Sequence, residues 1–232
     1  MPIKKIPFIY FLGLKIKHSL LSKKTKIQIE QYLKFAEIKK IQFGAGQNRL
    51  KTWLNTDYFA RKEIFFLDAT KKTPIPSSTF DFAFSEHHIE HIHYKEAQFM
   101  ISEIYRILKP GGVFRVCTPN LKNYLKSYFD TDAMDEPFVK EIMYDWIMLG
   151  FHNARNYIPK ENHENISFFI NDIFLNYSHK FIYDEQTLSN LLSEAGFETV
   201  YQSTPTKSNF AELTDIETHP SNPYTLVIEA IK

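Results

Sequence analysis

The sequence predicts an α/β fold built on a mainly parallel sheet of seven strands. Short apolar segments alternate with helical segments through the first half of the chain, which is typical of right-handed βαβ units. A glycine-containing turn, Gly44-Ala45-Gly46, directly follows the first apolar segment, as in folds that hold a ligand at a strand end. Near the C-terminus two apolar segments follow each other without a helix between them, which indicates an antiparallel pair at one edge.

The spacing of apolar residues and the turn residues locate the elements along the chain. Strands are expected at 39–43, 54–58, 63–67, 80–84, 113–117, 198–202 and 224–230. Helices are expected at 25–37, 94–108 and 185–195, and 50–54 leaves room for only a turn or two. The middle helix should stop at Lys109-Pro110-Gly111-Gly112, because proline cannot continue a helix and glycine permits a positive-φ turn.

These elements divide the chain into four parts. Residues 1–38 are expected to form an N-terminal helical extension and 39–120 a ligand-binding core, which 181–232 completes with a helix and the antiparallel strands. The intervening residues 121–180 are rich in Phe, Tyr, Asn and His and are too long for a plain connection. They predict a helical cap, inserted over the ligand crevice.

Length and charge limit the class of protein. A chain of 232 residues suits one large α/β domain or one domain with an insertion. Its 28 Lys and Arg nearly balance its 27 Asp and Glu, whereas dedicated nucleic-acid-binding proteins usually carry a basic excess, so no nucleic-acid partner is expected. The single cysteine, Cys117, excludes an intrachain disulfide and is expected to be inert inside a strand. A reducing, cytoplasmic location is the simplest interpretation.

The N-terminal segment combines Lys4 and Lys5 with an apolar run from Ile6 to Leu14. That run is too short to span a bilayer, and no small-residue cleavage site follows it. We expect the segment to pack against the domain, with a weak peripheral membrane contact as the alternative.

Residues 41–57 point to a nucleoside ligand. Glycines at the end of the first strand let a ligand approach the backbone, and Asp57 at the end of the second strand can accept hydrogen bonds from both ribose hydroxyls. A nicotinamide dinucleotide is the rival ligand, but it usually requires G-x-G-x-x-G running into a long helix. Here Arg49 occupies the third glycine position, and the next strand begins too soon for that helix.

These stretches resemble the class I S-adenosylmethionine-dependent methyltransferases, and most closely a small type 11 group that is often associated with bacterial surface-glycan biosynthesis. The resemblance covers residues 39–129 and 178–232 and is carried by IQFGAGQNRLKTWLNTD, FLDAT, STFDFAFSEHHIEHI, EIYRILKPGGVFRVCTPNL and HKFIYDEQTLSNLLSEAGFE. It implies a Rossmann-like sheet, S-adenosylmethionine as the cofactor and methyl transfer as the reaction.

The resemblance also implies which residues contact the cofactor. The expected set is Gln42, Gly44, Ala45, Gly46, Asp57, Tyr58, Asp68, Ala69, Ser85 and Glu86. The glycine turn would pass beneath the amino-acid part, Asp57 would bind the ribose, and Asp68 would meet the exocyclic amine of the adenine. Gln42 stands where the family usually has an acidic residue, and its amide cannot pair ionically with the methionyl ammonium. Tyr58 would pack on the ribose or adenine, or belong to the core.

Histidines are the candidates for chemistry with the methyl acceptor. The sulfonium methyl group is already activated, so positioning does most of the work, but a hydroxyl acceptor must still lose its proton. An imidazole with a pKa near neutrality suits that step, and His87 and His88 are best placed in the sequence. Substrate contacts are expected from Asn120 after the fifth strand, and from His152 and His179 in or beside the cap.

The run from Glu86 to His93 also invites a metal interpretation. His87 and His91 are four residues apart, so a helix would place them on one face, where zinc accepts imidazoles. The run lacks the order HExxH, and we expect no metal ion.

The sequence therefore favours a methyltransferase that acts on an oxygen of a small polar molecule, such as a sugar or a precursor of a surface polysaccharide. The substrate class follows from the resemblance alone. The alternatives are a non-catalytic binding or regulatory module that keeps the fold, and a nicotinamide-dependent oxidoreductase.

Overall fold

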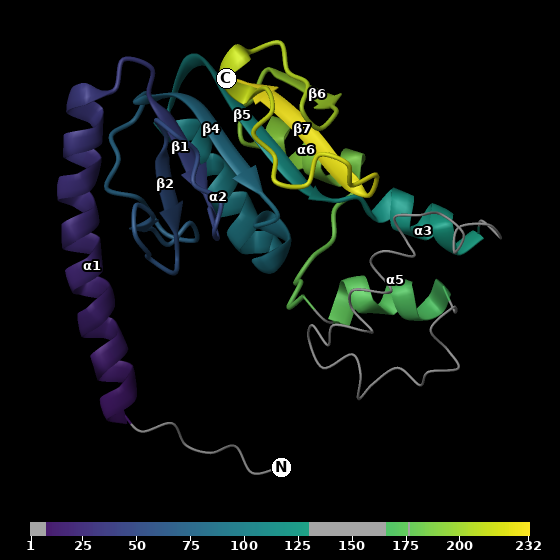
Figure 1. Cartoon of the computed structure of the whole chain (residues 1–232), viewed down its shortest axis with the longest axis horizontal. Coiled ribbons are helices and arrows are strands. Elements are labelled where there is room, and N and C mark those ends of the chain that lie inside the picture. Colours follow the sequence, from purple (N-terminus) through teal and green to yellow (C-terminus); the bar gives the residue numbers. More distant parts are fainter. Residues whose placement is uncertain (1–7, 130–165, 176) are drawn as a thin grey trace.

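The computed structural model describes residues 8–129, 166–175 and 177–232. Its strands are β1 Lys40–Phe43, β2 Leu54–Asp57, β3 Phe65–Phe66, β4 Phe80–Glu86, β5 Leu108–Pro119, β6 Thr199–Ser203 and β7 Thr225–Ile231. They form one seven-stranded sheet in the order β3-β2-β1-β4-β5-β7-β6 (Figure 1). Strands β1 to β5 are parallel, whereas β7 is antiparallel to both β5 and β6. The predicted Rossmann-like α/β sheet with antiparallel strands at one edge is confirmed.

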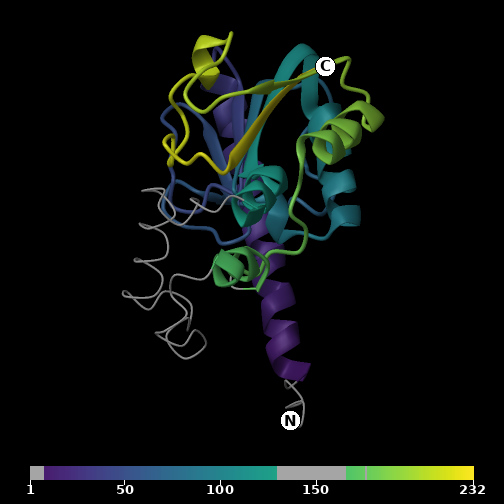
Figure 2. The same ribbon diagram turned by 90° about the vertical axis from the view of Figure 1, so that its right-hand side faces the viewer.

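Helices cover this sheet and extend beyond it. They are α1 Phe8–Phe35, α2 Tyr94–Ile107, α3 Leu121–Phe129, α5 Ile166–Leu175 and α6 Glu185–Glu194, with 3₁₀ turns η1 Ile89–His91 and η5 Ala211–Leu213. Helix α1 is longer than predicted, because the apolar N-terminal run continues into the helix expected at 25–37. It runs beside the β3 edge and projects past the sheet (Figures 1 and 2). None of the helices in the described part of the chain has the length and apolar character that crossing a bilayer requires.

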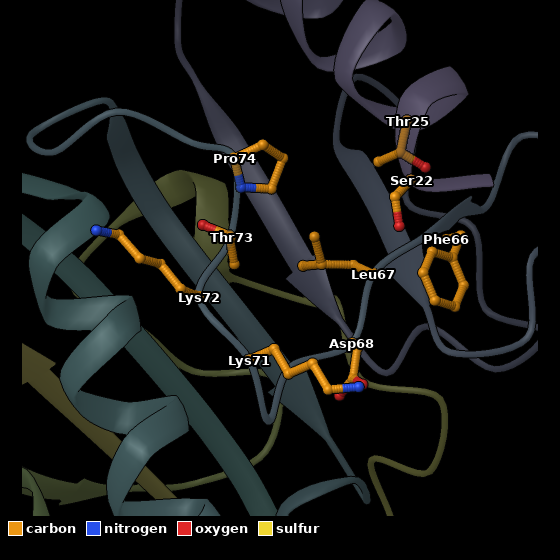
Figure 3. A pocket seen from close by; sticks show the side chains of 9 residues that line it. All are labelled: Ser22, Thr25, Phe66, Leu67, Asp68, Lys71, Lys72, Thr73 and Pro74. Carbon is orange, nitrogen blue, oxygen red and sulfur yellow. The ribbon is translucent and has the colours of Figure 1, made fainter. Parts of the chain in front are cut away.

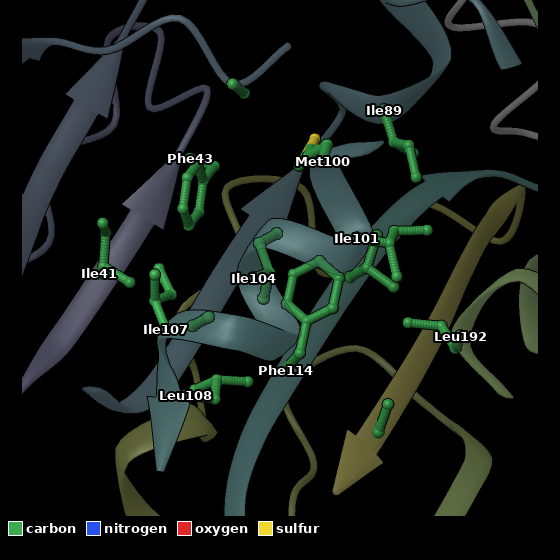
Figure 4. Close-up of a cluster of buried hydrophobic side chains, with 14 of the residues drawn as sticks. Ile41, Phe43, Ile89, Met100, Ile101, Ile104, Ile107, Leu108, Phe114 and Leu192 are labelled. Carbon is green, nitrogen blue, oxygen red and sulfur yellow. The ribbon is translucent and has the colours of Figure 1, made fainter. Parts of the chain in front are cut away.

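Both faces of the sheet are buried, so alternate residues of β5 enter different clusters. Phe114 and Val116 pack with residues of α2 and α6, including Ile104 and Leu192 (Figure 4). The cluster on the opposite face contains Cys117 with residues of η5 and its flanking loop. Burial raises the pKa of the Cys117 thiol well above its usual range, so this thiol stays protonated.

Two predicted boundaries were wrong. Leu108 is extended, so α2 ends one residue early and the Lys-Pro-Gly-Gly stretch belongs to the start of β5. Strand β3 keeps only two of its predicted residues, because a tight turn takes up its start. There Arg61 and Ile64 exchange backbone hydrogen bonds of 2.9 and 3.2 Å, and Glu63 has a φ of 62°.

The described part of the predicted cap consists of α3 and α5. These helices share a small apolar cluster in which Tyr124 and Ile173 are buried. Residues 130–165 lie outside the described residues, and with them His152, so the full extent of the cap stays a prediction.

The sheet order locates the place where a ligand would bind. The chain leaves β1 toward β2 and β3 on one side and returns to β4 on the other, so β1 and β4 are neighbours at a topological switch point. Ligands of open α/β sheets bind outside the carboxyl ends of the strands at such a point. Gly44 directly follows β1, and His87 directly follows β4.

Candidate cofactor-binding cleft

A cavity of about 670 Å³ lies at this switch point. Its wall comes from the glycine turn, the end of β4 with η1, residues of α3 and 173–179, and the C-terminal loop at 218–222. The predicted site residues that line it are Gln42, Gly44, Ala45, Gly46, Glu86, His87 and His179. The fold thus brings the glycine turn and one histidine of the predicted pair to a single cavity.

The glycine turn fits closely over His88. Gly44 has a φ of 65°, and a Cβ atom at this position would lie 2.3 Å from His88 Cγ. Gly46 has a φ of 55°, but the site of its Cβ has no atom within 4 Å, so this part of the turn is open. His88 is not among the residues that line the cavity; its ring supports the turn, and burial lowers the pKa of its imidazole.

Gln42 and Asp57 leave hydrogen-bonding capacity beside the turn, and both fit the expected cofactor. Within the described residues the buried Gln42 Oε1 has no hydrogen-bond partner, and an unsatisfied buried acceptor costs about 1–3 kcal/mol. The carboxylate of Asp57 accepts the Gly46 N–H at 2.9 Å and the Phe59 N–H at 2.7 Å. Each carboxylate oxygen has two lone pairs, so both can accept a further hydrogen bond. An ammonium at Gln42 and ribose hydroxyls at Asp57 would satisfy these atoms.

Asp57 touches the glycine turn without lining this cavity, and four other predicted cofactor residues also lie outside its lining. Asp68 lines a separate hollow of about 210 Å³ under α1, where Lys71 Nζ reaches its carboxylate at 2.6 Å (Figure 3). Burial raises the pKa of Asp68, but hydrogen bonds from Lys71 and Thr70 outweigh it and lower the pKa. Tyr58 is 42% exposed, whereas Ala69 and Ser85 are buried.

His87 is oriented by a buried carboxylate that sequence reasoning missed. His87 Nδ1 lies 3.1 Å from Glu90 Oε1, while Thr118 Oγ1 donates to Glu90 Oε2 at 3.0 Å. When Nδ1–H donates to Glu90, Nε2 is left as the acceptor nitrogen. Burial lowers the pKa of His87, but the hydrogen bond and charge of Glu90 outweigh it and raise the pKa. His87 precedes the 3₁₀ turn η1 and has a φ of 45°, so helical spacing does not produce this contact and the sequence carried no clear signal for it.

Replacing Glu90 by glutamine should lower the pKa of His87. The carboxylate favours the imidazolium form, and an amide of similar shape removes that charge while burial continues to favour the neutral ring. An NMR titration of the His87 ring protons would measure the change, with Glu194→Gln, at an exposed position, as the matched control. An unaltered titration midpoint in the Glu90 variant would contradict this assignment.

The C-terminal loop at 218–222 forms another part of the cavity wall. Thr218 donates its N–H to Glu86 Oε1 at 2.8 Å and its hydroxyl to Glu86 Oε2 at 2.7 Å. The Glu86 carboxylate therefore fixes this loop at the cavity. Asn120 likewise stabilises the local backbone, since its Oδ1 accepts the Lys122 N–H at 3.1 Å at the start of α3.

Comparisons with known proteins agree with this part of the fold. A family model described as a methyltransferase domain matches residues 42–116. A probable S-adenosylmethionine-dependent methyltransferase of Mycolicibacterium smegmatis is 47% identical over 47 residues, which are 20% of this chain and 18% of that protein. The match thus spans about a fifth of the length of this curated relative.

Two solved structures are similar over nearly their whole length. One is a SAM-dependent methyltransferase and possible histamine N-methyltransferase from Thermotoga maritima, with 20% identity, coverage of 97% of this chain and 98% of that chain, and a TM-score of 0.46. The other is a SAM-dependent methyltransferase from Archaeoglobus fulgidus, with 14% identity, coverage of 96% and 100%, and a TM-score of 0.47. Both TM-scores are below 0.5, so the fold is assigned from the strand order of this chain and not from these two structures. The residues that match the methyltransferase-domain model, 42–116, are those that carry the glycine turn, Asp57 and His87.

Proposed function

We propose that this chain is an S-adenosylmethionine-dependent methyltransferase that methylates an oxygen atom of a small polar acceptor in the cytoplasm. The observation that carries the proposal is the meeting of the glycine turn and the unpartnered Gln42 oxygen at one switch-point cavity, with Asp57 bonded to the turn through the Gly46 N–H. When bound, the cofactor supplies a methyl group activated by a sulfonium centre. The residues of the chain hold the reactants in line and accept a proton.

Binding depends on the strand ends. The backbone of the turn at Gly44 to Gly46 would lie against the amino-acid part of the cofactor, whose ammonium would donate to Gln42 Oε1. Asp57 would accept the ribose hydroxyls while its bond to Gly46 N–H keeps the turn in place. Hydrogen bonds that involve an ionised group are about twice as strong as neutral ones, so the two bonds from the ribose hydroxyls to the Asp57 carboxylate should contribute a large share of the polar binding energy.

His87 is the proposed general base. It lines the cavity, and the bond between its Nδ1 and Glu90 leaves Nε2 to take the proton of an acceptor hydroxyl. The buried Glu90 carboxylate then stabilises the imidazolium. Polar residues such as Thr218 and Asn222, together with Tyr177, line the same cavity and suit a polyhydroxylated acceptor such as a sugar or a precursor of a surface polysaccharide. Asn120, His152 and His179 remain predicted substrate contacts.

The two rival functions fit the geometry less well. A non-catalytic module would be favoured by a closed pocket above Gly44, but Gly44 lines an open cavity. A nicotinamide dinucleotide would need a helix N-terminus after β1 for its pyrophosphate. The stretch 44–53, which is described throughout, contains no helix.

Calorimetric titration with S-adenosylhomocysteine tests the proposal. The unmodified chain should bind this product, and Asp57→Ala should weaken binding about 10- to 100-fold, because a hydrogen bond to a charged group contributes about 1.5–3 kcal/mol. Glu63→Gln is the matched control, because Glu63 forms an exposed ion pair with Arg49 outside the cavity. No binding, or equal binding by the Asp57 variant, would count against the proposal.

A further inference from the structure

A second group of chemically reactive side chains lies in the wall of the cavity. Glu90, His91 and His179 each offer one possible metal-ligating atom, and these atoms lie within 4.8 Å of one another. We propose that the three residues bind a divalent transition-metal ion, zinc by the character of its ligands, with a further coordination position open to the cavity. Two imidazoles and one carboxylate, with a water or substrate atom as the fourth ligand, form an established type of open zinc site. This inference goes beyond methyl transfer and does not depend on it.

His179 is prepared as a ligand by the groups around it. Its Nδ1 lies 2.5 Å from the backbone oxygen of Ile173, so Nδ1–H donates there and Nε2 remains free to ligate. Histidines that bind metals almost always donate their other ring N–H to a carbonyl or carboxylate, which fixes the tautomer and ring orientation. Tyr177 stacks on the ring, with centroids 5.2 Å apart. Burial lowers the pKa of His179, which favours the neutral form that binds metals.

Backbone hydrogen bonds join the two segments that supply the ligands. The N–H groups of Lys180 and Phe181 donate to the backbone oxygen of Glu90 at 2.7 and 3.3 Å. The rings of His91 and His179 consequently lie with their centroids 4.8 Å apart. The ligands come from distant parts of the sequence, but the backbone holds them as neighbours before any ion arrives.

Glu90 supplies the negative charge of the group. Its side chain is fully buried, and each oxygen already accepts one hydrogen bond, from His87 or from Thr118. Each oxygen keeps one lone pair for a further partner. Burial raises the pKa of Glu90, but the hydrogen bond from His87 and the nearby histidine charges outweigh it and lower the pKa. The carboxylate is therefore ionised and available to a cation.

A small movement of one exposed side chain would bring the three ligand atoms to the separations that zinc requires. Ligand atoms around a tetrahedral zinc ion at about 2.0–2.2 Å stand about 3.3 Å apart, so the widest separation must close by about 1.5 Å. His91 is exposed, so its ring can rotate to make this approach. From the sequence, His87 with His91 was considered as a metal-binding pair and no metal ion was expected; in the structure His87 instead pairs with Glu90, and His91 lies against His179, which the sequence does not reveal.

Zinc titration of the chelator-treated, untagged full chain tests the site. Calorimetry should show saturable binding of one zinc ion per chain, and a cobalt(II) titration should give the visible absorption of a tetrahedral site. His91→Ala and His179→Ala should each weaken zinc binding by at least about tenfold, the smallest loss typical even of residues that only support a ligand. His219→Ala, which removes an exposed histidine lining the same cavity outside the group, should leave the affinity unchanged.

The outcomes separate this inference from the proposed function. If His179→Ala fails to fold by circular dichroism, the exposed His91 variant still decides the result. Absence of saturable zinc binding, or an equal loss in the His219 variant, would overturn the metal site. Binding of S-adenosylhomocysteine by the same chelator-treated protein reports on the cofactor cleft alone, so either proposal can fail while the other stands.

Discussion

Arg115→Ala should lower the free energy of unfolding by about 3–5 kcal/mol, because it leaves buried carboxylates without their counter-charge. The Arg115 side chain has no exposed surface and lies in β5, near the middle of the sheet. Its Nη1 donates to Glu229 Oε1 at 2.5 Å, and its Nε donates to Glu217 Oε1 at 2.6 Å. Both carboxylates are themselves buried, so water cannot replace the guanidinium.

Urea denaturation would measure this loss. The matched control is Arg49→Ala, which breaks the ion pair with Glu63, where the side chains are 49% and 64% exposed. Exposed ion pairs contribute about 0–1 kcal/mol, so the control should unfold close to the unmodified protein. Similar midpoints for the two variants would show that the Arg115 cluster contributes little.

Arg115→Ala should also weaken cofactor binding. Arg115 donates to the backbone oxygens of Thr204 and Lys207 at 2.9 and 3.0 Å, so it fastens the connection between β6 and β7 to the sheet. The cavity-lining loop at 218–222 belongs to this connection. Glu217, the ion-pair partner, directly precedes Thr218, which lines the cavity. Calorimetry with S-adenosylhomocysteine in conditions where the variant is folded should therefore show reduced affinity, although Arg115 touches no ligand.

Gly44→Ala is expected to have the second-largest effect and to lower the free energy of unfolding by about 2–5 kcal/mol. Overpacking a filled site costs about 1–3 kcal/mol, and a left-handed conformation costs an L-residue about 1–2 kcal/mol more. Here the new Cβ would stand 2.3 Å from His88 Cγ at a φ of 65°. The turn must move to relieve this clash, so the variant should also lose affinity for S-adenosylhomocysteine.

Two further variants separate the clash from the backbone strain. Gly46→Ala has a φ of 55° but meets no atom within 4 Å, so it should show only the strain, about 1–2 kcal/mol. Alanine at position 88 would keep a Cβ only 2.5 Å from the new one, so the background needed is His88→Gly; there the nearest clashing atoms are removed, and Gly44→Ala should become milder, closer to Gly46→Ala. Thermal or urea unfolding would measure the free energy of unfolding of Gly44→Ala, of Gly46→Ala, of the His88 variant alone and of the double variant at positions 44 and 88. Equal losses at Gly44 with and without His88 would mean that the ring does not limit the turn.

The parts of the fold that were predictable are those with strong local signals. The glycine turn after β1 and Asp57 at the end of β2 were located because short-range chemistry dictates both. The start of β5 was missed because the Lys-Pro-Gly-Gly stretch signals a helix end equally well whether a turn or a strand follows. An N-terminal helical extension was expected over residues 1–38, but the apolar spacing located its helix only at 25–37, whereas α1 begins at Phe8.

The site was harder to predict because it depends on contacts between distant residues. His87 and His88 are adjacent, and no sequence pattern distinguishes them. His87 has a φ of 45°, and in the fold it lines the cavity while the neighbouring ring lies against Gly44. The bond between Thr218 and Glu86 joins positions 132 residues apart, which periodicity cannot reveal. The place of Asp68 in the sequence suggested a contact with the adenine, but in the fold its carboxylate is paired with Lys71.

The position of β7 has a consequence for synthesis of the chain on the ribosome. This strand is the last of the described strands to be made, yet it lies inside the sheet between β5 and β6. Until residues 225–231 emerge, one side of β5 has no partner, and unpaired apolar strands invite aggregation. Nascent chains should therefore need chaperone protection until residues 225–231 have emerged, and fragments that stop before residue 225 should aggregate rather than fold.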